Sequence, residues 1–169
     1  MGINNSQLIP VFSNLEIVRV ATLAKTIWTQ HYTPIIGKEQ VDYMLHKFQS
    51  AETIKSQITD GSQYFLLHSE NDLGYLSIQA EEQTLFLSKI YLLQTERGKG
   101  LGKKMMNFIT SKAHEMRLNS IRLTVNKYNH NAIASYEKMG FTKKREVVFD
   151  IGNGYIMDDY EMVLELYSI

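Results

Sequence analysis

The stretch that decides the fold reads LSKIYLLQTERGKGLGKK and covers residues 87–104. An apolar run typical of a strand leads into a turn with three glycines, and a helical pattern begins directly after the turn. Small residues let a ligand approach the backbone closely, and the N–H groups at a helix start favour a phosphate. Lys99, Lys103 and Lys104 add positive charge nearby. The segment therefore predicts a site for a phosphorylated ligand.

The spacing of Gly98, Gly100 and Gly102 narrows the choice of ligand. The dinucleotide fingerprint needs G-x-G-x-x-G, and this turn is one residue too short for it. The nucleotide P-loop needs G-x-x-x-x-G-K followed by Ser or Thr, whereas Lys103 is followed here by Lys104. A tight turn without a ligand is the structural alternative, although three glycines in five residues weaken local structure without obvious gain.

Two motifs carry a family resemblance. The pattern Arg97-x-x-Gly100-x-Gly102 resembles the acetyl-coenzyme A motif (Q/R-x-x-G-x-G/A) of the GNAT superfamily of N-acetyltransferases. The run N-x-x-A-I-x-x-Y-E-K-x-G-F, from Asn129 to Phe141, resembles the late helix of that family and the strand after it. The resemblance covers the chain from about Gln7 to Leu166, the first third by element order alone.

Composition predicts one domain, residues 1–169, because the chain has 169 residues and 44% hydrophobic content. Eighteen basic and eighteen acidic residues give zero net charge, which argues against a nucleic-acid partner. The chain has no cysteine, so disulfides, a cysteine zinc site and a thiol nucleophile are excluded. The polar N-terminus resembles no signal peptide, and no apolar run has membrane-spanning length. We therefore expect a cytoplasmic protein with no membrane partner.

Apolar periodicity and turn residues predict the order of elements. Ser13 and Glu16 form a capping box for a first helix that Pro34 and Gly37 end. The other predicted helices cover residues 41–48, 50–60, 102–116 and 131–139. The predicted strands cover residues 7–12, 64–68, 73–80, 84–93, 120–125, 147–151 and 162–166. With the resemblance, this order implies an α/β (α+β) GNAT-like fold, a single domain with a mixed central sheet of about six to seven strands and helices on both faces.

The resemblance implies acetyl-CoA as cosubstrate and assigns residues to it. The pantetheine arm would pair with the strand backbone at Ile90, Tyr91 and Leu92. The pyrophosphate would meet the turn and helix start, at Arg97, Gly98, Lys99, Gly100, Leu101, Gly102 and Lys103. Asn129 matches the family's asparagine beside the pantetheine or phosphate, with a helix cap or turn residue as the alternative. Lys99, Lys104 and Lys138 are candidates for the 3′-phosphate, with solvated surface lysines as the alternative. No metal is implied.

Tyr136 matches the family's general acid, which protonates the thiolate that leaves when an amine attacks the thioester. Its alternative is packing in the core, because it lies at helical spacing from Ile133 and Met139. The base is not identified, because residues 84–92 and 120–125 contain no carboxylate. Deprotonation through water is expected to involve one of the more distant candidates, which are Glu81, Glu82, His31, Asp158 and Asp159.

The acceptor is expected to be a small cationic amine. Residues 146–165 are acidic without Lys or Arg, whereas residues 97–112 are basic, and opposite fields would recruit the amine and the acidic coenzyme. A solvated acidic face is the alternative for most of these carboxylates. Residues 152–160 combine glycines, aromatics and carboxylates and suggest a substrate-lining loop. Trp28, Tyr43 and this segment resemble the bacterial spermidine/spermine acetyltransferase-like branch, which implies a polyamine.

Two alternatives to a small-amine acetyltransferase stay open. Acetylation of a protein N-terminus or lysine ranks lower, because the long region 33–61 is expected to cover the site. A non-catalytic acyl-CoA-binding regulatory module would explain the missing base. The family also contains many homodimers, so a homodimer is one expected assembly.

Overall fold

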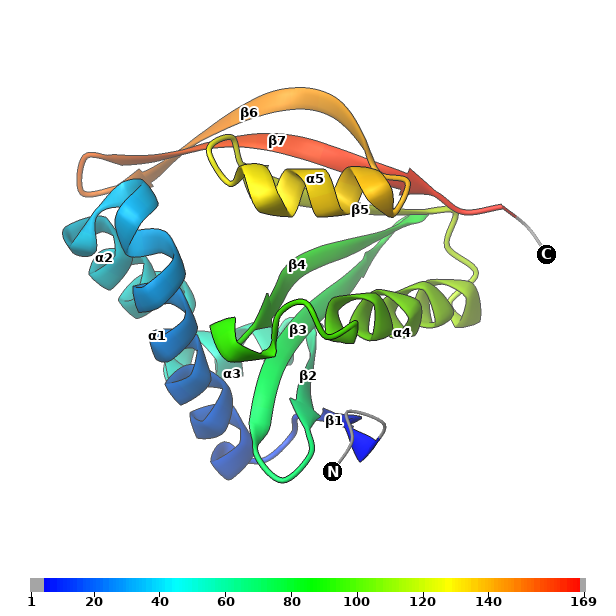
Figure 1. Cartoon of the computed structure of the whole chain (residues 1–169), viewed down its shortest axis with the longest axis horizontal. Coiled ribbons are helices and arrows are strands. Elements are labelled where there is room, and N and C mark those ends of the chain that lie inside the picture. The colour runs from blue at the N-terminus through cyan, green and yellow to red at the C-terminus, as the bar shows by residue number, and fades with distance from the viewer. Residues whose placement is uncertain (1–4, 168–169) are drawn as a thin grey trace. The chain divides into compact units, whose positions relative to one another are not determined.

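The computed structural model describes residues 5–167. Its helices are α1 (Asn14–Ile36), α2 (Lys38–Phe48), α3 (Ala51–Thr59), the short 3-10 turn η2 (Gln94–Glu96), α4 (Leu101–Glu115) and α5 (His130–Lys138) (Figure 1). Its strands are β1 (Gln7–Pro10), β2 (Gln63–His68), β3 (Asp72–Glu81), β4 (Thr84–Leu92), β5 (Ser120–Asn126), β6 (Thr142–Gly152) and β7 (Tyr155–Glu165). Seven strands pair in the order β1-β2-β3-β4-β5-β7-β6. The predicted mixed α/β sheet is therefore confirmed.

The chain forms two compact units. Unit 1 comprises Met1–Gln79 and Lys89–Ile109, and unit 2 comprises Ala80–Ser88 and Thr110–Ile169. Strands β3 and β4 and helix α4 each contribute residues to both units. The predicted glycine turn lies in unit 1, and the second motif lies in unit 2.

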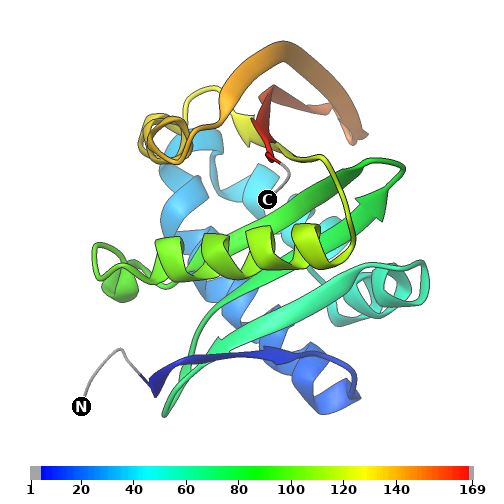
Figure 2. The same ribbon diagram turned by 90° about the vertical axis from the view of Figure 1, so that its right-hand side faces the viewer.

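In unit 1 the antiparallel strands β1, β2 and β3 carry helices on both faces. Figure 2 shows β1 running along β2, where Gln7 lies opposite His68. The hydroxyl of Tyr64 on β2 bonds to Gln57 on α3, whereas the ring of the next residue, Phe65, lies 4.8 Å from the ring of Phe108 on α4. Successive strand residues point to opposite faces, so α3 and α4 cover different faces of this part of the sheet.

Helix α1 begins where the sequence predicts and ends at its cap residue Gly37, the second of the two residues predicted to end it. The capping box is confirmed, because the Ser13 side chain accepts a bond from the Glu16 amide and Glu16 bonds back to Ser13. The prediction that Pro34 ends the helix is wrong, since α1 continues to Ile36 with Pro34 inside it. A proline this close to a helix end removes one late backbone bond, and the turn closes through the Gly37 amide, which donates to the Thr33 carbonyl at 3.0 Å.

Unit 2 holds a ladder of strands. The first residues of β4, Thr84–Phe86, pair in parallel with Ser120–Arg122 of β5, and β7 lies antiparallel to both β5 and β6. Strands β6 and β7 begin much earlier than predicted and form a long hairpin. The loop conformation predicted for residues 152–160 is therefore wrong: only Asn153 and Gly154 form the turn, both with positive φ (53° and 79°), and β7 starts at Tyr155. An Asn-Gly turn of this kind matches the twist of two paired strands, so it needs no longer loop.

Candidate functional site

The glycine turn of unit 1 has the backbone geometry of an anion site. Gly98 and Gly100 have φ values of 76° and 83°, a conformation that favours glycine, and a Cβ on either would meet nothing within 4 Å. The first backbone bond of α4 runs from the Lys104 amide to the Gly100 carbonyl at 3.1 Å. The N–H groups of Leu101, Gly102 and Lys103 therefore precede the helical ladder, at its positive end. An open, left-handed turn that ends on such amides can hold a phosphate.

The basic side chains around this turn differ in what they contact. Lys104 donates to the Ser6 carbonyl and to the Ser6 hydroxyl, the latter at 2.9 Å, so it is held beside the start of β1. Lys99 pairs with Glu96 at 3.2 Å. The exposed Arg97 places Nη1 3.3 Å from Nδ1 of His31 and Nη2 3.4 Å from the Leu92 carbonyl. Lys103 is exposed in the first turn of α4.

The end of β4 carries Ile90, Tyr91 and Leu92, all half-buried. Close contact with β3 positions this segment, because a Cβ on Gly74 would lie 2.4 Å from the Tyr91 carbonyl oxygen. The Leu93 amide also donates to the Leu73 carbonyl at 2.9 Å. Only glycine permits this close approach of β3 to β4. Sequence reasoning did not identify Gly74, because its only signal is a lone glycine inside a strand pattern.

An aromatic cluster supports the same segment from the α1 side. The Tyr91 ring lies 5.5 Å from the ring of Trp28 and 5.4 Å from the ring of Tyr75, and Trp28 lies 4.5 Å from Tyr32. Trp28 and Tyr75 are both buried and belong to the core of unit 1. The Tyr75 hydroxyl donates to the Gln49 side chain at 3.1 Å, and burial raises the pKa of Tyr75 well above its ordinary value. The strand end that the family resemblance assigns to pantetheine is therefore backed by aromatic side chains.

Lys89 is a buried cation on β4 that the sequence did not single out. Its Nζ donates to the Phe48 carbonyl at 2.9 Å, to Gln57 Oε1 at 3.0 Å and to the Tyr64 hydroxyl. Burial lowers the pKa of Lys89 to about 7. Its one sequence signal is a lysine at an inward position of the alternating pattern after Leu85 and Leu87.

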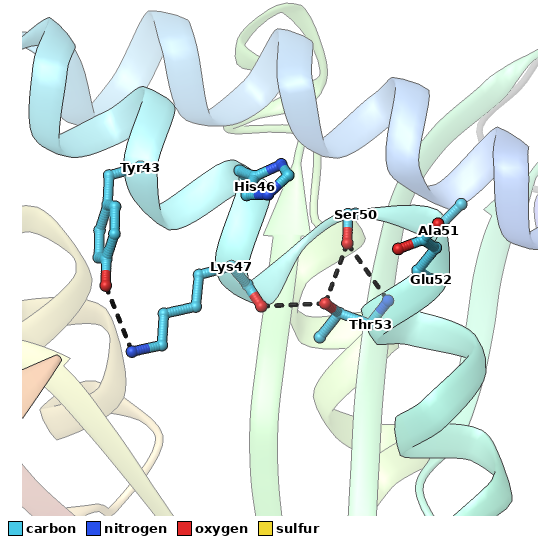
Figure 3. A pocket seen from close by; sticks show the side chains of 7 residues that line it. All are labelled: Tyr43, His46, Lys47, Ser50, Ala51, Glu52 and Thr53. Atoms are coloured by element: carbon cyan, nitrogen blue, oxygen red, sulfur yellow. Dashed lines mark hydrogen bonds between the residues drawn. The ribbon is translucent and has the colours of Figure 1, made fainter. Parts of the chain in front are cut away.

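A hollow of about 520 Å³ lies where α2 meets α3 in unit 1 (Figure 3). Its wall includes the Ser50 hydroxyl, which caps α3 by accepting from the Thr53 amide at 3.2 Å, and Thr53 in turn donates to the Lys47 carbonyl at 3.0 Å. The lining residues are Tyr43, His46, Lys47, Ser50, Ala51, Glu52 and Thr53. None of the residues that the motifs assign to the coenzyme is among them.

In unit 2 the second motif spans the junction of β5 and α5. Asn129 is 6% exposed and occupies the N-cap position, but its side chain makes no capping bond, which removes the cap as an explanation for it. Its amide donates to the Asn126 carbonyl at 3.0 Å. Tyr136 is half-buried on α5, with its ring 5.6 Å from that of Phe141. Lys138 is exposed near the end of the helix.

The carboxylates considered as bases differ sharply in their surroundings. Glu81 holds Arg122 through two bonds of 2.8 and 2.9 Å, and Asp158 pairs with Lys127 at 2.6 Å. Asp159 is 3% exposed. Burial first, and the neighbouring charge of Asp158 second, raise the pKa of Asp159 to about 6, against opposing effects of the Thr124 hydroxyl and Lys127.

Several acidic residues between 146 and 165 have basic partners. Glu161 pairs with Arg145 at 3.2 Å, and Glu146 lies 3.5 Å from Lys127. These ion pairs favour the interpretation of residues 146–165 as a solvated acidic face, because basic partners offset part of its negative charge. Within residues 5–167, no group of three His, Cys, Asp or Glu side chains is placed to hold a metal ion. None of the helices in that range is long and apolar enough to cross a membrane.

Comparison with known proteins gives several relatives with acetyltransferase names. D-amino-acid N-acetyltransferase HPA3 of Saccharomyces cerevisiae is 29% identical over 83 residues, which are 49% of this chain and 50% of that relative. The chain thus spans about half the length of that curated relative. An uncharacterized N-acetyltransferase of Lactobacillus delbrueckii subsp. lactis is 27% identical over 125 residues, or 68% of this chain and 72% of the relative.

Solved structures share the fold. The PaiA N-acetyltransferase of Thermoplasma acidophilum, crystallised with coenzyme A, superposes with a TM-score of 0.79 at 16% identity, covering 95% of this chain and 99% of that one. A chimaera of the spermidine N-acetyltransferase SpeG from Vibrio cholerae and hSSAT gives 0.70 at 17% identity, covering 95% of each chain.

A single family match covers both sequence motifs. The family described as acetyltransferase (GNAT) domain matches residues 32–164, which include the glycine turn of unit 1 and the β5–α5 junction of unit 2. The fold, the turn geometry and this match agree with one another. The chain therefore belongs to the GNAT acetyltransferase family.

Proposed function

We propose that the chain transfers the acetyl group of acetyl-CoA to the primary amine of a small cationic molecule, with a polyamine as the first candidate. The observation that carries the proposal is the open turn at Gly98 and Gly100, which leads into the free amide end of α4. A coenzyme with a pyrophosphate suits that end of the helix. Asp150 and Glu165, the exposed carboxylates of residues 146–165 without an ion pair among the described residues, support a cationic acceptor, because exposed negative charge attracts an ammonium group.

The coenzyme contacts follow from the two motifs. The pyrophosphate meets the backbone from Arg97 to Gly102 and the side chain of Lys103, and the pantetheine amides pair with the backbone of Ile90, Tyr91 and Leu92. Asn129 binds the pantetheine or a phosphate, since its buried side chain makes no capping bond. Lys138 and Lys99 are exposed cations for the 3′-phosphate. Lys104 is not part of this set, because Ser6 holds it.

The proposed chemistry is a direct transfer. The amine nitrogen attacks the thioester carbonyl, a carbon–nitrogen bond forms, and the carbon–sulfur bond breaks. The phenol of Tyr136 gives its proton to the departing thiolate, and the proton that the amine nitrogen loses as it becomes an amide restores the phenol. The products are the N-acetylated amine and coenzyme A.

A second acceptor class deserves the same assay, because the yeast relative is named a D-amino-acid N-acetyltransferase. A D-amino acid carries a carboxylate next to its amine, whereas a polyamine does not. The two classes are therefore separated by their charge. Protein N-termini and lysines form the third set of acceptors.

The first experiment is a thermal melt with acetyl-CoA, with NAD and ATP as matched ligands. A ligand at about 100 times its Kd stabilises a protein by about 2.7 kcal/mol, so acetyl-CoA alone should raise the midpoint clearly. Gly100→Ala should abolish the rise, because alanine disfavours a φ of 83° and shifts the turn. Gly37→Ala is the matched control: its φ is 84°, its Cβ also has nothing within 4 Å, and it lies between α1 and α2.

Turnover with a panel of polyamines, D-amino acids and peptides then tests the acceptor. Polyamine acetylation is the expected result. Activity on peptides alone would replace the proposal with a protein acetyltransferase, and coenzyme binding without turnover would leave a regulatory acyl-CoA-binding module. A larger shift with NAD or ATP than with acetyl-CoA would overturn the coenzyme assignment.

A further inference from the structure

A protonated amine cannot attack a thioester, so the proposed reaction needs a group that removes a proton. Strands β4 and β5 contain no carboxylate. Strand β7 contributes Asp159, which is 3% exposed and lies directly opposite Asn126 of β5 and Val147 of β6. The Asn126 carbonyl in turn receives the amide of Asn129. Asp159 therefore lies at the β5–α5 junction that carries the second family motif.

The register shows which face of the unit 2 sheet carries this carboxylate. Paired residues of antiparallel strands share a face, and residues two apart along a strand share it too. Asp159 therefore shares its face with Asn126, Thr124 and Glu161. Leu164 belongs to the other face, where a Cβ on Gly140, just after α5, would lie 3.2 Å from it. The Asp159 side chain thus leaves the sheet on the face opposite the end of α5.

The charged groups around Asp159 are engaged with one another. On the same face, Arg122 binds Glu81 and also lies 3.6 Å from Glu161. Lys127 binds Asp158 at 2.6 Å and Glu146 at 3.5 Å. Among the described residues, no lysine or arginine forms an ion pair with Asp159, and the Thr124 hydroxyl is its hydrogen-bonding neighbour. Burying an ionised carboxyl without a neighbouring cation costs folding free energy. Carboxyls of this kind cluster at functional sites, where a shifted pKa serves the chemistry.

We propose that Asp159 is the proton acceptor for the amine, directly or through one water molecule. This inference rests on the proposed function. Asp159 takes one proton from the ammonium group before the nitrogen bonds to the acetyl carbon. The sulfur that leaves takes the proton of Tyr136, and the second proton that the nitrogen loses as it becomes an amide restores the phenol. The proton on Asp159 returns to solvent after product release.

The ionisation of Asp159 suits this task. A carboxyl with a pKa near 6 is ionised at neutral pH and is a stronger base than an ordinary aspartate. Glu81 and Asp158 are weaker candidates, because Arg122 and Lys127 hold their charges. Burial raises the pKa of Asp159 most, Asp158 raises it further, and Thr124 and Lys127 lower it.

The test is the pH dependence of turnover by Asp159→Asn, on the amine that the wild type acetylates. We expect kcat at pH 7 to fall by about 10²–10⁴, the usual contribution of a positioned base. The loss should shrink at pH 9–10, because free amine then reaches the enzyme already deprotonated. The shift of the melting midpoint by acetyl-CoA should stay unchanged. Glu115→Gln, which changes an exposed carboxylate of α4, is the control and should keep kcat within a few-fold at every pH. Asp158→Asn should move the acid limb of the profile slightly to lower pH, because the charge of Asp158 raises the pKa of Asp159.

Two results would overturn the proposal: wild-type turnover by Asp159→Asn, or a loss of equal size at every pH, which is the mark of a structural role. If Asp159→Asn does not fold, the pH profile of kcat for Thr124→Val provides the test. Losing the Thr124 hydroxyl should raise the pKa of Asp159 and move the acid limb of that profile to higher pH. An unmoved limb in that variant would also reject Asp159 as the base. A wild type that binds acetyl-CoA but acetylates no amine would instead remove the proposed function itself.

Discussion

The Nζ of Lys89, on β4, donates a hydrogen bond of 2.9 Å to the carbonyl of Phe48 at the end of α2. The other acceptors of this ammonium, Gln57 and the Tyr64 hydroxyl, are neutral as well. No carboxylate pairs with Lys89 among the described residues. The strand is thus fastened to the α2–α3 segment by a charge that lacks a counter-ion, and the protonated form is the costly one.

The free energy of unfolding should rise as the pH rises above 7, because buried Lys89 loses its costly proton. The folded pKa is about 7 and the ordinary value 10.5, so between these limits the unfolded chain binds more protons than the folded one, and unfolding becomes harder with rising pH. The free energy of unfolding should grow by about 2 kcal/mol from pH 7 to 9 on this account. Urea denaturation of wild type and Lys89→Met measures it; parallel pH slopes for the two proteins would contradict it.

Asp159 should have the opposite effect at lower pH. Its folded pKa of about 6 exceeds the ordinary 3.8, so the folded protein binds the extra proton between these values, and its stability falls as the pH rises through this window. The full penalty, on the order of 2–3 kcal/mol, is present above pH 6. Asp159→Asn should therefore melt higher than wild type at pH 8 and lose this advantage near pH 4. A variant that melts lower at pH 8 would indicate a structural carboxylate.

Tyr136→Phe should lower kcat by about 10²-fold while the Kd for acetyl-CoA stays the same. The reason is that the phenol supplies the proton for the thiolate, whereas phenylalanine keeps the ring that packs 5.6 Å from Phe141. Steady-state kinetics together with calorimetry separate the two quantities. An unchanged kcat would mean that Tyr136 is a packing residue, the alternative that its helical spacing leaves open.

Gly74→Ala should cost about 1–3 kcal/mol of stability and weaken acetyl-CoA binding, because the new Cβ would lie 2.4 Å from the Tyr91 carbonyl and push the strand end away. Gly102→Ala is the comparison, since its Cβ would meet only a Leu92 methyl at 4.0 Å. Denaturation of both variants measures the free energy of unfolding, and titration with acetyl-CoA measures the Kd. Equal behaviour of the two would show that the close approach at Gly74 is not required.

Local chemistry explains which parts of the fold the sequence predicted well. The capping box at Ser13 and Glu16 and the glycine turn are set by residues a few positions apart, so their signals are readable without a tertiary context. The hairpin at Asn153 and Gly154 was misjudged, because glycines and aromatics beside the turn resembled a loop whereas register with β6 makes Tyr155 the start of a strand. Tertiary pairing overrides such local composition.

The residues of the candidate site also differ in how well the sequence could predict them. The motif residues were visible because the family spacing is local. Gly74, Lys89 and the burial of Asp159 were not, because each depends on a neighbour brought near by folding: the Tyr91 carbonyl, the Phe48 carbonyl and the β5 and β6 strands. A single glycine, lysine or aspartate in a strand pattern gives no measure of these contacts.

The bond between Lys104 and Ser6 has a consequence for how acetyl-CoA reaches the enzyme. Together with the pairing of Lys99 and Glu96, it occupies two of the cations that the sequence places beside the turn. Attraction of the coenzyme then depends more on fixed backbone dipoles than on mobile surface charge. Dipole interactions act over short distances, whereas steering by net charge fades as ionic strength rises. The association rate should consequently still fall between dilute buffer and physiological salt, because Lys103 and Lys138 stay exposed, but by less than if Lys99 and Lys104 were also free.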